Sequence, residues 1–427
     1  MLKIGVLGAY RGKSMIDVLM VYREAELVAI CDKFQPALEK VKKQAENMGL
    51  NNISYYNNFE DFLKHDMDAV VLANYATEHA TFAVKCLRAG MHVMSEVLPC
   101  ETMAQAVELI EAVEESGLVY SYAENYCYMQ DTFEMWKKYE TGELGDVVYA
   151  EGEYIHDCTG CWPQITYGDK NHWRNLMHPN FYCTHSLGPI MTITGRRPVK
   201  VVGYETPPVK ENILKTGRVG GAGIEIVTLD NGAVVKSMHG AFIREPARNF
   251  YSVYCEKGVM ESSSDKESRA LNIYLQEKGR FCVGEWERYT PVNEIQKETA
   301  SKFKTHGGSD FYSVYLFIQK ILGKPDGKWS IDVYRAVDMG ICGILAWRSC
   351  LNGNIPVDIP DLSKPAQREK YRNDNACTNP AVAGEQVVPK TTYEIKEAPD
   401  EVYDNVKKLW ENGLDINGEA DTVYSNL

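Results

Sequence analysis

Two glycines and a carboxylate near the start of the chain have the types and spacing of a site for phosphate and ribose. Gly8 and Gly12 lie in a polar turn after the apolar run 3–7, and Asp32 closes a second apolar run, 27–31. Glycines let the backbone approach a pyrophosphate at a helix N-terminus, and a carboxylate after the second strand accepts hydrogen bonds from ribose hydroxyls. A carboxylate there also repels a 2′-phosphate. The stretch therefore predicts binding of NAD, which is favoured over NADP.

The glycine pattern is incomplete when it is taken alone. Gly5, Gly8 and Gly12 do not form G-x-G-x-x-G, because Tyr10 occupies the place of the middle glycine. An ordinary turn between a strand and a helix is the alternative interpretation, since such turns often contain glycine. The order of the elements that follow favours the dinucleotide site.

Strands and helices alternate along the first third of the chain. Short strands are predicted, each separated from the next by a helical segment, at 53–55, 68–74, 92–96 and 118–122. This alternation predicts a doubly wound parallel sheet, the Rossmann arrangement. Ligands of such sheets lie beyond the carboxyl ends of the strands. Polar residues that follow these ends are predicted to face one crevice: Asn74, His79, Glu96, Glu124 and Asn125.

Longer strands joined by short turns are predicted beyond residue 145, at 147–155, 199–205, 224–229, 233–239, 251–261 and 271–276. Their short turns favour antiparallel pairing. The loop 157–184 is rich in Trp, His, Tyr and Pro, and long loops at the mouth of a sheet are usually functional. Helices are predicted at 309–322, 331–350 and 401–412.

The predicted fold class is α/β, with an N-terminal Rossmann sheet and a C-terminal α+β domain that contains a large, mainly antiparallel sheet. We predict an NAD-binding domain over 1–122 and a substrate and catalytic domain over 123–360. A C-terminal extension over 361–427 is predicted to pack on the body of the protein or on a neighbouring subunit.

Composition and charge exclude several classes of protein. The net charge of −13 over 427 residues, without a basic run, argues against nucleic acid or an anionic membrane as partner. Met1 leads directly into the first strand and no long apolar stretch follows, so a cytoplasmic protein is predicted. Cys158 and Cys161 form the only C-x-x-C among 12 cysteines, and without a second pair they do not predict a metal site.

Both predicted domains carry a family resemblance. The Rossmann half, the strand that ends at Glu96, the antiparallel domain and the run 182–189 (YCTHSLGP) resemble the Gfo/Idh/MocA superfamily of NAD(P)-dependent sugar oxidoreductases. That superfamily usually has Glu-Lys-Pro after the strand, and its lysine is the customary proton shuttle. This chain reads Glu96-Val97-Leu98-Pro99. The missing lysine argues against ordinary alcohol dehydrogenation.

One branch of that superfamily also lacks the lysine: the NAD-dependent glycoside hydrolases of family 109, typified by α-N-acetylgalactosaminidase. The chain resembles this branch over about residues 3 to 360. The matching pieces are Arg11-Gly12, Asp32, Thr77-Glu78-His79, Glu96-Val97, Glu124-Asn125-Tyr126, Tyr154-Ile155-His156-Asp157, Trp173-Arg174 and Tyr182-Cys183-Thr184-His185. Ala76 replaces a tryptophan of that branch, and the loop between Asp157 and Trp173 is shorter. Tyr251 is the candidate for its late substrate tyrosine.

The resemblance implies an enzyme that cleaves a small glycoside by transient oxidation at C3, elimination across C1 and C2, addition of water and re-reduction. His185 would be the base for the C3 hydroxyl, because imidazole titrates near neutral pH. Tyr182 would remove the C2 proton if a cation lowers its pKa, and Arg174 is the nearest candidate in sequence. Tyr154 and Glu124 would hold sugar hydroxyls or relay the proton of the leaving group.

The resemblance also implies the remaining site residues. Catalytic candidates are Tyr182, His185, Tyr154 and Glu124, and substrate-binding candidates are Tyr154, Arg174, Tyr182 and Trp173. Cofactor-binding candidates are Gly8, Tyr10, Arg11, Gly12, Asp32, Asn74, Thr77, His79, Glu96, Val97, Asn125, Tyr182 and His185. No metal site is expected. The protein is expected to form a homodimer or a homotetramer. Two alternatives stay open: an NAD-dependent sugar dehydrogenase that uses His185 and Tyr182 without lysine, and a catalytically idle NAD-binding sensor.

Overall fold

The computed structural model describes residues 1–208, 220–241, 247–264, 268–277, 283–303, 305–395, 397–414 and 418. The chain groups into two compact units. Unit 1 comprises Met1–Glu134, Val292–Gly340 and Asp361–Asp374, and unit 2 comprises Met135–Pro291, Ile341–Pro360 and Asn375–Leu427. Two later segments of the chain therefore belong to the same unit as its N-terminal part. The three consecutive domains predicted from the sequence do not include this return.

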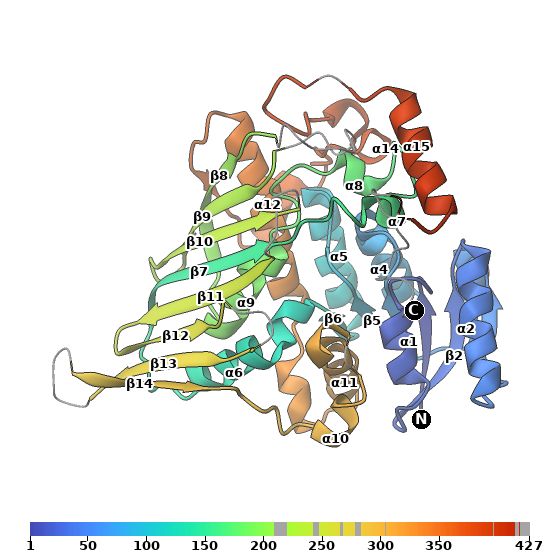
Figure 1. Ribbon diagram of the computed structural model, residues 1–427, viewed down its shortest axis with the longest axis horizontal. Helices are drawn as coiled ribbons and strands as arrows, with labels where there is room; N and C mark the ends of the chain where they lie inside the picture. Colours follow the sequence, from blue (N-terminus) through green and yellow to red (C-terminus); the bar gives the residue numbers. More distant parts are fainter. Residues whose placement is uncertain are drawn as a thin grey trace. The chain divides into compact units, whose positions relative to one another are not determined.

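Unit 1 contains a six-stranded parallel sheet in the order β3-β2-β1-β4-β5-β6. Figure 1 labels three of its strands, β2, β5 and β6. The strands are β1 (Leu2–Leu7), β2 (Ala25–Cys31), β3 (Ser54–Tyr56), β4 (Ala69–Leu72), β5 (His92–Ser95) and β6 (Tyr120–Tyr122). This order is that of the Rossmann fold, with its switch point between β1 and β4. All of β4 is buried, as its continuous apolar run predicts for a strand covered on both faces. The predicted Rossmann sheet is confirmed.

Helix α5 (Met103–Ser116) of unit 1 begins and ends at capping residues. The Thr102 side chain accepts a hydrogen bond from the Gln105 N–H, and Gly117 ends the helix in the left-handed conformation. The other helices are α1 (Lys13–Leu19), α2 (Gln35–Asn47), α3 (Phe59–Phe62), α4 (His79–Arg88), α10 (Lys297–Ala300), α11 (Ser309–Ile321) and α13 (Pro365–Arg368). Single turns of 3-10 helix lie at η1 (Ala76–Glu78), η2 (Asn125–Tyr128), η3 (Thr305–Gly308), η4 (Pro325–Trp329) and η5 (Glu369–Tyr371). Two helices run on from unit 1 into unit 2, α6 (Gln130–Glu140) and α12 (Val333–Leu351).

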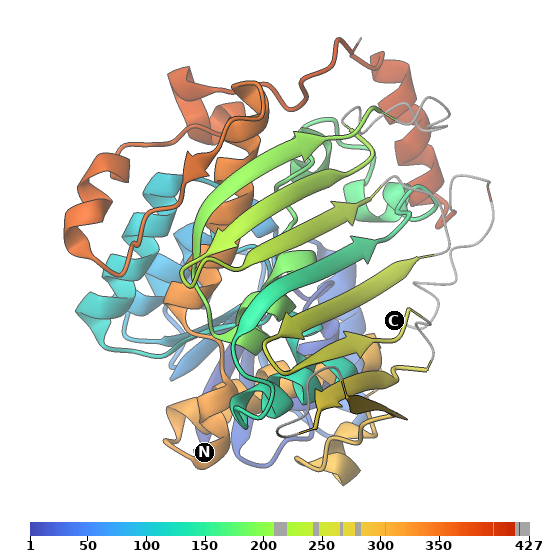
Figure 2. The same ribbon diagram turned by 90° about the vertical axis from the view of Figure 1, so that its left-hand side faces the viewer.

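Unit 2 contains a nine-stranded sheet in the order β14-β13-β12-β11-β7-β10-β9-β8-β15, which Figure 2 shows from its open face. The strands are β7 (Val147–Ile155), β8 (Pro198–Glu205), β9 (Gly223–Leu229), β10 (Val234–Gly240), β11 (Arg248–Cys255), β12 (Gly258–Ser262), β13 (Leu271–Gln276), β14 (Gly284–Tyr289) and β15 (Val357–Asp358). The β7 and β10 pair is parallel and the other pairs are antiparallel. The predicted, mainly antiparallel sheet is confirmed. The prediction of one strand over 251–261 is wrong, because β11 and β12 form a hairpin there.

Helix α9 (Thr184–Thr194) packs against one face of this sheet, on β7, β10 and β11 (Figure 1). The two backbones approach closely at Gly152, where a Cβ would lie 1.9 Å from the Ser186 carbonyl oxygen. The Ser186 and Ser237 hydroxyls, 2.9 Å apart, join the helix to β10 at the same level. The sequence of β7 therefore needs glycine at this position.

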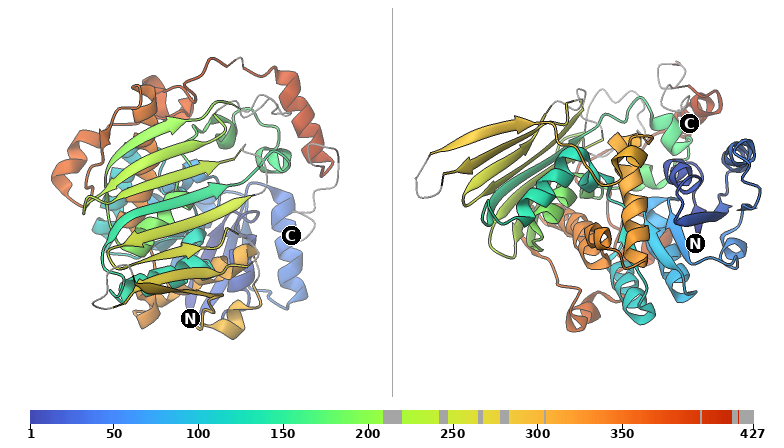
Figure 3. Two further views of the ribbon diagram at one scale, coloured as in Figure 1. Left: turned by 60° about the vertical axis from the view of Figure 1, so that its left-hand side comes forward. Right: turned by 90° about the horizontal axis from the view of Figure 1, so that it is seen from below.

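The predicted loop 157–184 contains two short helices, α7 (Trp162–Thr166) and α8 (Trp173–Leu176). Helix α15 (Asp400–Glu411) packs on α7 within unit 2, where the Tyr167 and Trp410 rings lie 5.2 Å apart. The right-hand view of Figure 3 shows β13 and β14 at one end of the sheet. Two further turns, α14 (Pro380–Ala383) and η6 (Gly384–Gln386), lie between the sheet and α15 in sequence.

A search of the described residues finds no helix with the length and apolar character needed to cross a membrane. In the same part of the chain, no group of three or more His, Cys, Asp or Glu side chains is arranged to hold a metal ion.

Candidate active site

In the glycine turn of unit 1, Gly8 and Gly12 occupy positions that leave no room for a side chain. Gly8 has a φ of +100°, and a Cβ there would lie 2.4 Å from the Ala73 carbonyl oxygen. A Cβ at Gly12, which precedes α1, would lie 2.3 Å from the Gly8 carbonyl oxygen. Tyr10 and Arg11 lie between these glycines. The turn is thus a backbone cradle of the kind that receives a pyrophosphate in dinucleotide-binding folds.

The carboxylate of Asp32 lies beside this turn at the end of β2. Its Oδ2 accepts a hydrogen bond from the Ala9 N–H at 2.6 Å, and its Oδ1 accepts one from the Phe34 N–H at 2.8 Å. Burial raises the pKa of Asp32, while the two backbone N–H groups and Lys33 act in the opposite direction. The position after β2, the neighbouring turn and the negative charge fit the ribose acid that the sequence predicts.

Replacing Asp32 by asparagine is expected to weaken NAD binding by about 10-fold and to reduce the preference for NAD over NADP. The amide removes the negative charge that repels a 2′-phosphate, and its nitrogen cannot accept the Ala9 N–H bond. Titrating the intrinsic fluorescence with NADH and NADPH measures both affinities. Asp66→Asn, on the surface, is the matched control; equal affinity ratios in Asp32→Asn and wild type would refute the assignment.

Arg11 belongs to an ionic network around two buried carboxylates, Glu96 and Asp310. Its Nη2 pairs with the Glu96 carboxylate and lies 3.6 Å from Asp310 Oδ1, and His306 Nδ1 lies 2.9 Å from Asp310 Oδ2. Burial alone would raise the pKa of Asp310, but His306, Arg11 and a hydrogen bond from Ser14 hold it below its ordinary value. Sequence reasoning identified Arg11 and Glu96 but missed Asp310 and His306, because they come from a segment almost 300 residues away.

Two residues that follow β4 carry buried polar atoms without hydrogen-bond partners. The Asn74 Nδ2 donates to Glu78 Oε2 at 2.9 Å, whereas Asn74 Oδ1 has no partner. His79 Nδ1 lies 3.1 Å from the Leu98 carbonyl oxygen, and Nε2 has no partner of good geometry. Burial lowers the pKa of His79 to about 4, so the ring is neutral. Buried polar atoms of this kind are usually satisfied by a ligand or water, which fits a cofactor at this edge of the sheet.

The remaining predicted residues of unit 1 lie near the ends of β4, β5 and β6. Thr77 lies in the turn η1, and the Val97 N–H donates to Glu96 Oε2 at 3.2 Å. Glu124 is fully buried and accepts a hydrogen bond from the Tyr126 N–H, and Asn125 begins η2. Unit 1 thus brings the predicted cofactor residues to the carboxyl edge of its sheet, apart from Tyr182 and His185, which belong to unit 2.

In unit 2, the His185 ring lies between two phenols. Its centroid is 4.8 Å from that of Tyr154 and 4.9 Å from that of Tyr182, both in edge-to-face geometry. His185 lies in the first turn of α9, and its carbonyl oxygen accepts a hydrogen bond of 2.6 Å from the Tyr251 hydroxyl. Tyr251, the candidate late substrate tyrosine, is fully buried and holds the start of this helix.

Trp173 and Arg174 complete this group on the other side of Tyr182. The Trp173 and Tyr182 rings stack 6.2 Å apart, and Arg174 Cζ lies 4.3 Å from the Trp173 ring centroid and 5.8 Å from that of Tyr182. His172 caps α8, its Nδ1 accepting the Arg174 N–H at 3.2 Å. We call Tyr154, Trp173, Arg174, Tyr182 and His185 the ring cluster. All five come from the set that the sequence predicts as catalytic or substrate-binding.

A buried carboxyl, which sequence reasoning missed, lies on β9 of the same sheet. Glu225 accepts hydrogen bonds of 2.7 Å from Asn180 Nδ2 and from the Ser237 hydroxyl. Burial raises the pKa of Glu225 to about 7. In the sequence, Glu225 is a polar residue between two isoleucines of a strand, and such alternation normally indicates a side chain that faces solvent. The structure instead places the Glu225 side chain on the buried face of the sheet.

Replacing Glu225 by glutamine is expected to stabilise the protein above pH 7 and to have little effect near pH 4.5. The pKa of Glu225 is higher in the folded state than in the unfolded state. Protonated Glu225 therefore contributes its full share to the free energy of unfolding below pH 4.5, and this contribution is lost as the pH rises through about 7. The full effect is roughly 3 kcal/mol. Urea unfolding at pH 4.5 and pH 8 measures it, with the exposed Glu143→Gln as control. An unchanged pH dependence of stability in Glu225→Gln would contradict the assignment.

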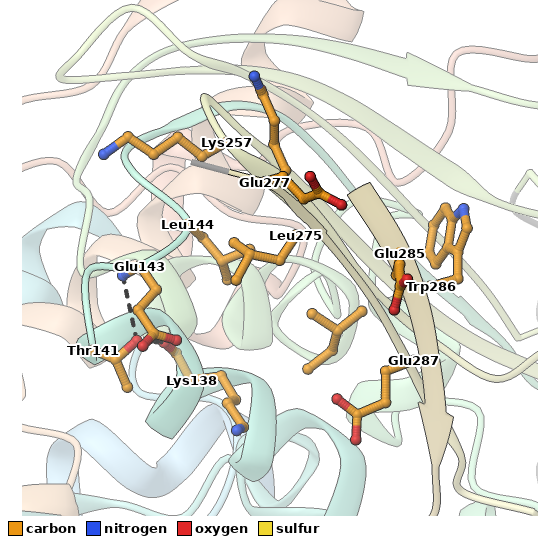
Figure 4. Close-up of a pocket in the computed structure, with 12 residues that line it drawn as sticks. Lys138, Thr141, Glu143, Leu144, Lys257, Leu275, Glu277, Glu285, Trp286 and Glu287 are labelled. Carbon is orange, nitrogen blue, oxygen red and sulfur yellow. Dashed lines mark hydrogen bonds between the residues drawn. The ribbon is translucent and has the colours of Figure 1, made fainter. Parts of the chain in front are cut away.

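A pocket of about 1210 Å³ lies at another place in unit 2 (Figure 4). Its lining comes from α6, the segment between α6 and β7, the turn between β11 and β12, and the hairpin of β13 and β14, and it includes Lys138, Leu144, Leu275 and Trp286. These residues lie near the beginning of β7, whereas Tyr154 lies near its end. None of the predicted site residues lines this pocket, and the ring cluster is a separate feature.

The Rossmann sheet, the glycine cradle and Asp32 define a dinucleotide-binding protein, and the comparison with family models agrees. Residues 2–124 match the model described as "Oxidoreductase family, NAD-binding Rossmann fold" (GFO_IDH_MocA). The predicted resemblance to this superfamily and the prediction of NAD as cofactor are confirmed. The protein is an NAD-dependent enzyme.

Two curated relatives carry the name of the predicted branch. A glycosyl hydrolase family 109 protein of Phocaeicola vulgatus is 25% identical over 412 residues, covering 85% of this chain and 84% of the relative. One of Porphyromonas gingivalis is 26% identical, covering 85% of this chain and 84% of the relative. Scyllo-inositol dehydrogenase of Lactobacillus casei, solved with NAD(H) and scyllo-inositol, shares the fold with a TM-score of 0.65 at 16% identity, over 85% of this chain and 100% of that one.

Proposed function

We propose that this protein is an NAD-dependent glycoside hydrolase that acts on a small glycoside through transient oxidation of the sugar at C3. The observation that carries the proposal is the ring cluster: an imidazole between two phenols, with a guanidinium beside one of them. The relatives named glycosyl hydrolase family 109 support it. The sequence also has Val97 where the dehydrogenases of this superfamily carry their lysine.

Bound NAD would supply the redox chemistry, accepting a hydride from sugar C3 and returning it at the end of the cycle. We infer that the glycine cradle, Asp32, Asn74 and His79 hold it, with Glu96, Val97 and Asn125 nearer the nicotinamide ribose. The ring cluster of unit 2 would carry out the proton transfers on the sugar.

The His185 imidazole is the proposed base for the C3 hydroxyl, since a neutral imidazole can take that proton at neutral pH. Once C3 is a ketone, the C2 proton is acidic, and Tyr182 is the proposed base that removes it. Arg174 Cζ lies 5.8 Å from the Tyr182 ring centroid, where a positive charge stabilises negative charge that develops on the phenol during proton removal. Loss of the C1 substituent and addition of water then complete cleavage. Tyr154 and Glu124 are the candidates for holding sugar hydroxyls or for protonating the leaving group.

Incubation with nitrophenyl glycosides and catalytic NAD tests the proposal. The expected result is release of nitrophenol without net formation of NADH. Steady accumulation of NADH from a free sugar, with no nitrophenol released from any glycoside, would instead support a sugar dehydrogenase. That alternative is supported by His185 itself, because an imidazole can serve as the base for alcohol oxidation without a lysine.

A second part of the proposal concerns assembly. We infer a homodimer or homotetramer that forms through the open face of the nine-stranded sheet, where Tyr204, Val234 and Tyr254 are exposed. Light scattering after size-exclusion chromatography measures the molar mass. A mass equal to that of one chain at micromolar concentration would exclude this part and leave the proposed chemistry unaffected.

A further inference from the structure

Three polar side chains form a row across neighbouring strands of unit 2. His239 on β10 is the register partner of Tyr154 on β7, and Tyr154 is the register partner of Asn249 on β11. Residues directly opposite each other in a sheet point to the same face. Gly152 of β7 packs against α9, and the Tyr251 hydroxyl of β11 donates to the main chain of α9. Tyr154 and Asn249 are each two residues away from these positions on the same strands, so they point to the same face. The row therefore lies on the face of the sheet that α9 covers.

The two outer members of this row are buried and carry polar atoms without partners. His239 and Asn249 are each 5% exposed. Asn249 Nδ2 has no hydrogen-bond partner, and neither ring nitrogen of His239 has one of good geometry. The middle member, Tyr154, contacts His185 in the ring cluster. Because buried polar groups in folded proteins are nearly always hydrogen-bonded, a ligand or an ordered water is the expected partner of these atoms.

The chemistry of the row fits an uncharged, hydroxyl-bearing ligand. Burial lowers the pKa of His239 to about 3; the nearby Pro179 carbonyl acts against this effect, and the electrostatic interaction with His185 adds to it. A neutral imidazole offers one donor and one acceptor, which matches a hydroxyl group, and an amide NH₂ donates to a hydroxyl or carbonyl oxygen. His239 Nδ1 lies 3.8 Å from Glu225 Oε1, on the side of the ring that faces β9.

We propose that His239 and Asn249 are specificity-determining residues that bind two uncharged substituents of a sugar ring, one on each side of Tyr154. The inference rests on the proposed function for the class of substrate, and it goes beyond it by assigning two residues that neither the sequence motifs nor the ring contacts identify. It predicts that sugars lacking a hydroxyl or acetamido group at the contacted positions bind weakly, because the two side chains are then left unpaired.

Calorimetric titration of the NAD-loaded, full-length protein with free sugars tests this inference. The probes are N-acetylgalactosamine, galactose, glucose and a 2-deoxy sugar. Asn249→Ala and His239→Phe are expected to weaken binding of the best probe by about 10-fold or more. His239→Gln, which keeps a donor and an acceptor, is expected to retain more affinity than His239→Phe; a merely structural role would not produce that order. Affinity for NAD should be unchanged.

Met238→Leu is the matched control, since Met238 is the neighbour of His239 on β10 and points to the opposite face. Wild-type affinity in Asn249→Ala and His239→Phe would overturn the inference and leave the proposed function standing. If the wild-type protein binds no sugar and cleaves no glycoside, the proposed function fails and the inference fails with it. If the variants do not fold, crystals of the wild-type protein with the best probe decide: a sugar oxygen within about 3.2 Å of Asn249 Nδ2 supports the inference, and its absence overturns it.

Discussion

Replacing His185 by alanine is expected to lower kcat for glycoside cleavage by about 10²- to 10⁴-fold, the usual contribution of a general base. The imidazole between Tyr154 and Tyr182 is the proposed acceptor of the C3 hydroxyl proton. The fold should survive, because alanine is a good helix former and the Tyr251 hydroxyl binds the main-chain carbonyl of residue 185, which the substitution keeps. Steady-state kinetics and circular dichroism measure the two effects.

His65→Ala is a suitable control, since His65 belongs to unit 1, where it contacts Tyr56, and is not among the proposed site residues. An unchanged kcat in His185→Ala would remove the imidazole from the mechanism. Near-unchanged cofactor turnover in the double variant Tyr182→Phe, His185→Ala would go further and support the idle NAD-binding sensor. A fall in kcat is the outcome that the proposed proton transfer requires.

The parallel sheet of unit 1 could be predicted because burial on both faces leaves a clear record in the sequence. The apolar run of β4 and the polar residues that follow it, such as Asn74, reflect a strand covered on both sides and a ligand edge. The glycine cradle was also predictable, because a turn with a positive φ usually requires glycine and the sequence has one there. The φ of Gly8 is indeed positive. Local sequence was sufficient wherever one element or one turn determined the structure.

The ring cluster was predictable through motifs, whereas the residues around it were not. His239 and Asn249 lie next to Tyr154 only because of the register of three strands, and nothing local in the sequence specifies that register. Asp310 meets Arg11 through a similarly long-range approach. These positions depend on tertiary pairing, which short-range patterns do not record.

Two of the errors in the strands of unit 2 have local causes. The turn between β11 and β12 is Glu256-Lys257, which lacks the Asn-Gly or Asp-Gly pair that usually marks a two-residue hairpin, so the sequence does not show where one strand ends. Strand β14 was missed because it is an edge strand rich in charge, and even its Trp286 is 59% exposed. Edge strands bury little and therefore show a weak hydrophobic pattern.

Replacing Gly152 by alanine is expected to cause the largest loss of stability of any single methyl addition near the ring cluster. The new Cβ would lie 1.9 Å from the Ser186 carbonyl oxygen and 2.9 Å from its carbon, so α9 must move away from β7. Overpacking of this kind usually costs about 1–3 kcal/mol and sometimes more. Thermal denaturation should therefore show a melting temperature lower by several degrees, roughly 2–4 °C for each kcal/mol in a domain of 150–250 residues.

Gly160→Ala is the matched control, because a Cβ at that position would meet no heavy atom within 4 Å and the φ of Gly160 is not in the left-handed region. Activity separates a local from a global effect. Helix α9 carries His185 in its first turn, and a shift of the helix displaces the imidazole relative to Tyr154 and Tyr182. Gly152→Ala should consequently lose kcat even at temperatures where it is fully folded, because proton transfer depends steeply on geometry. A variant with wild-type melting temperature and kcat would show that the close approach of α9 to β7 does not determine where the imidazole lies.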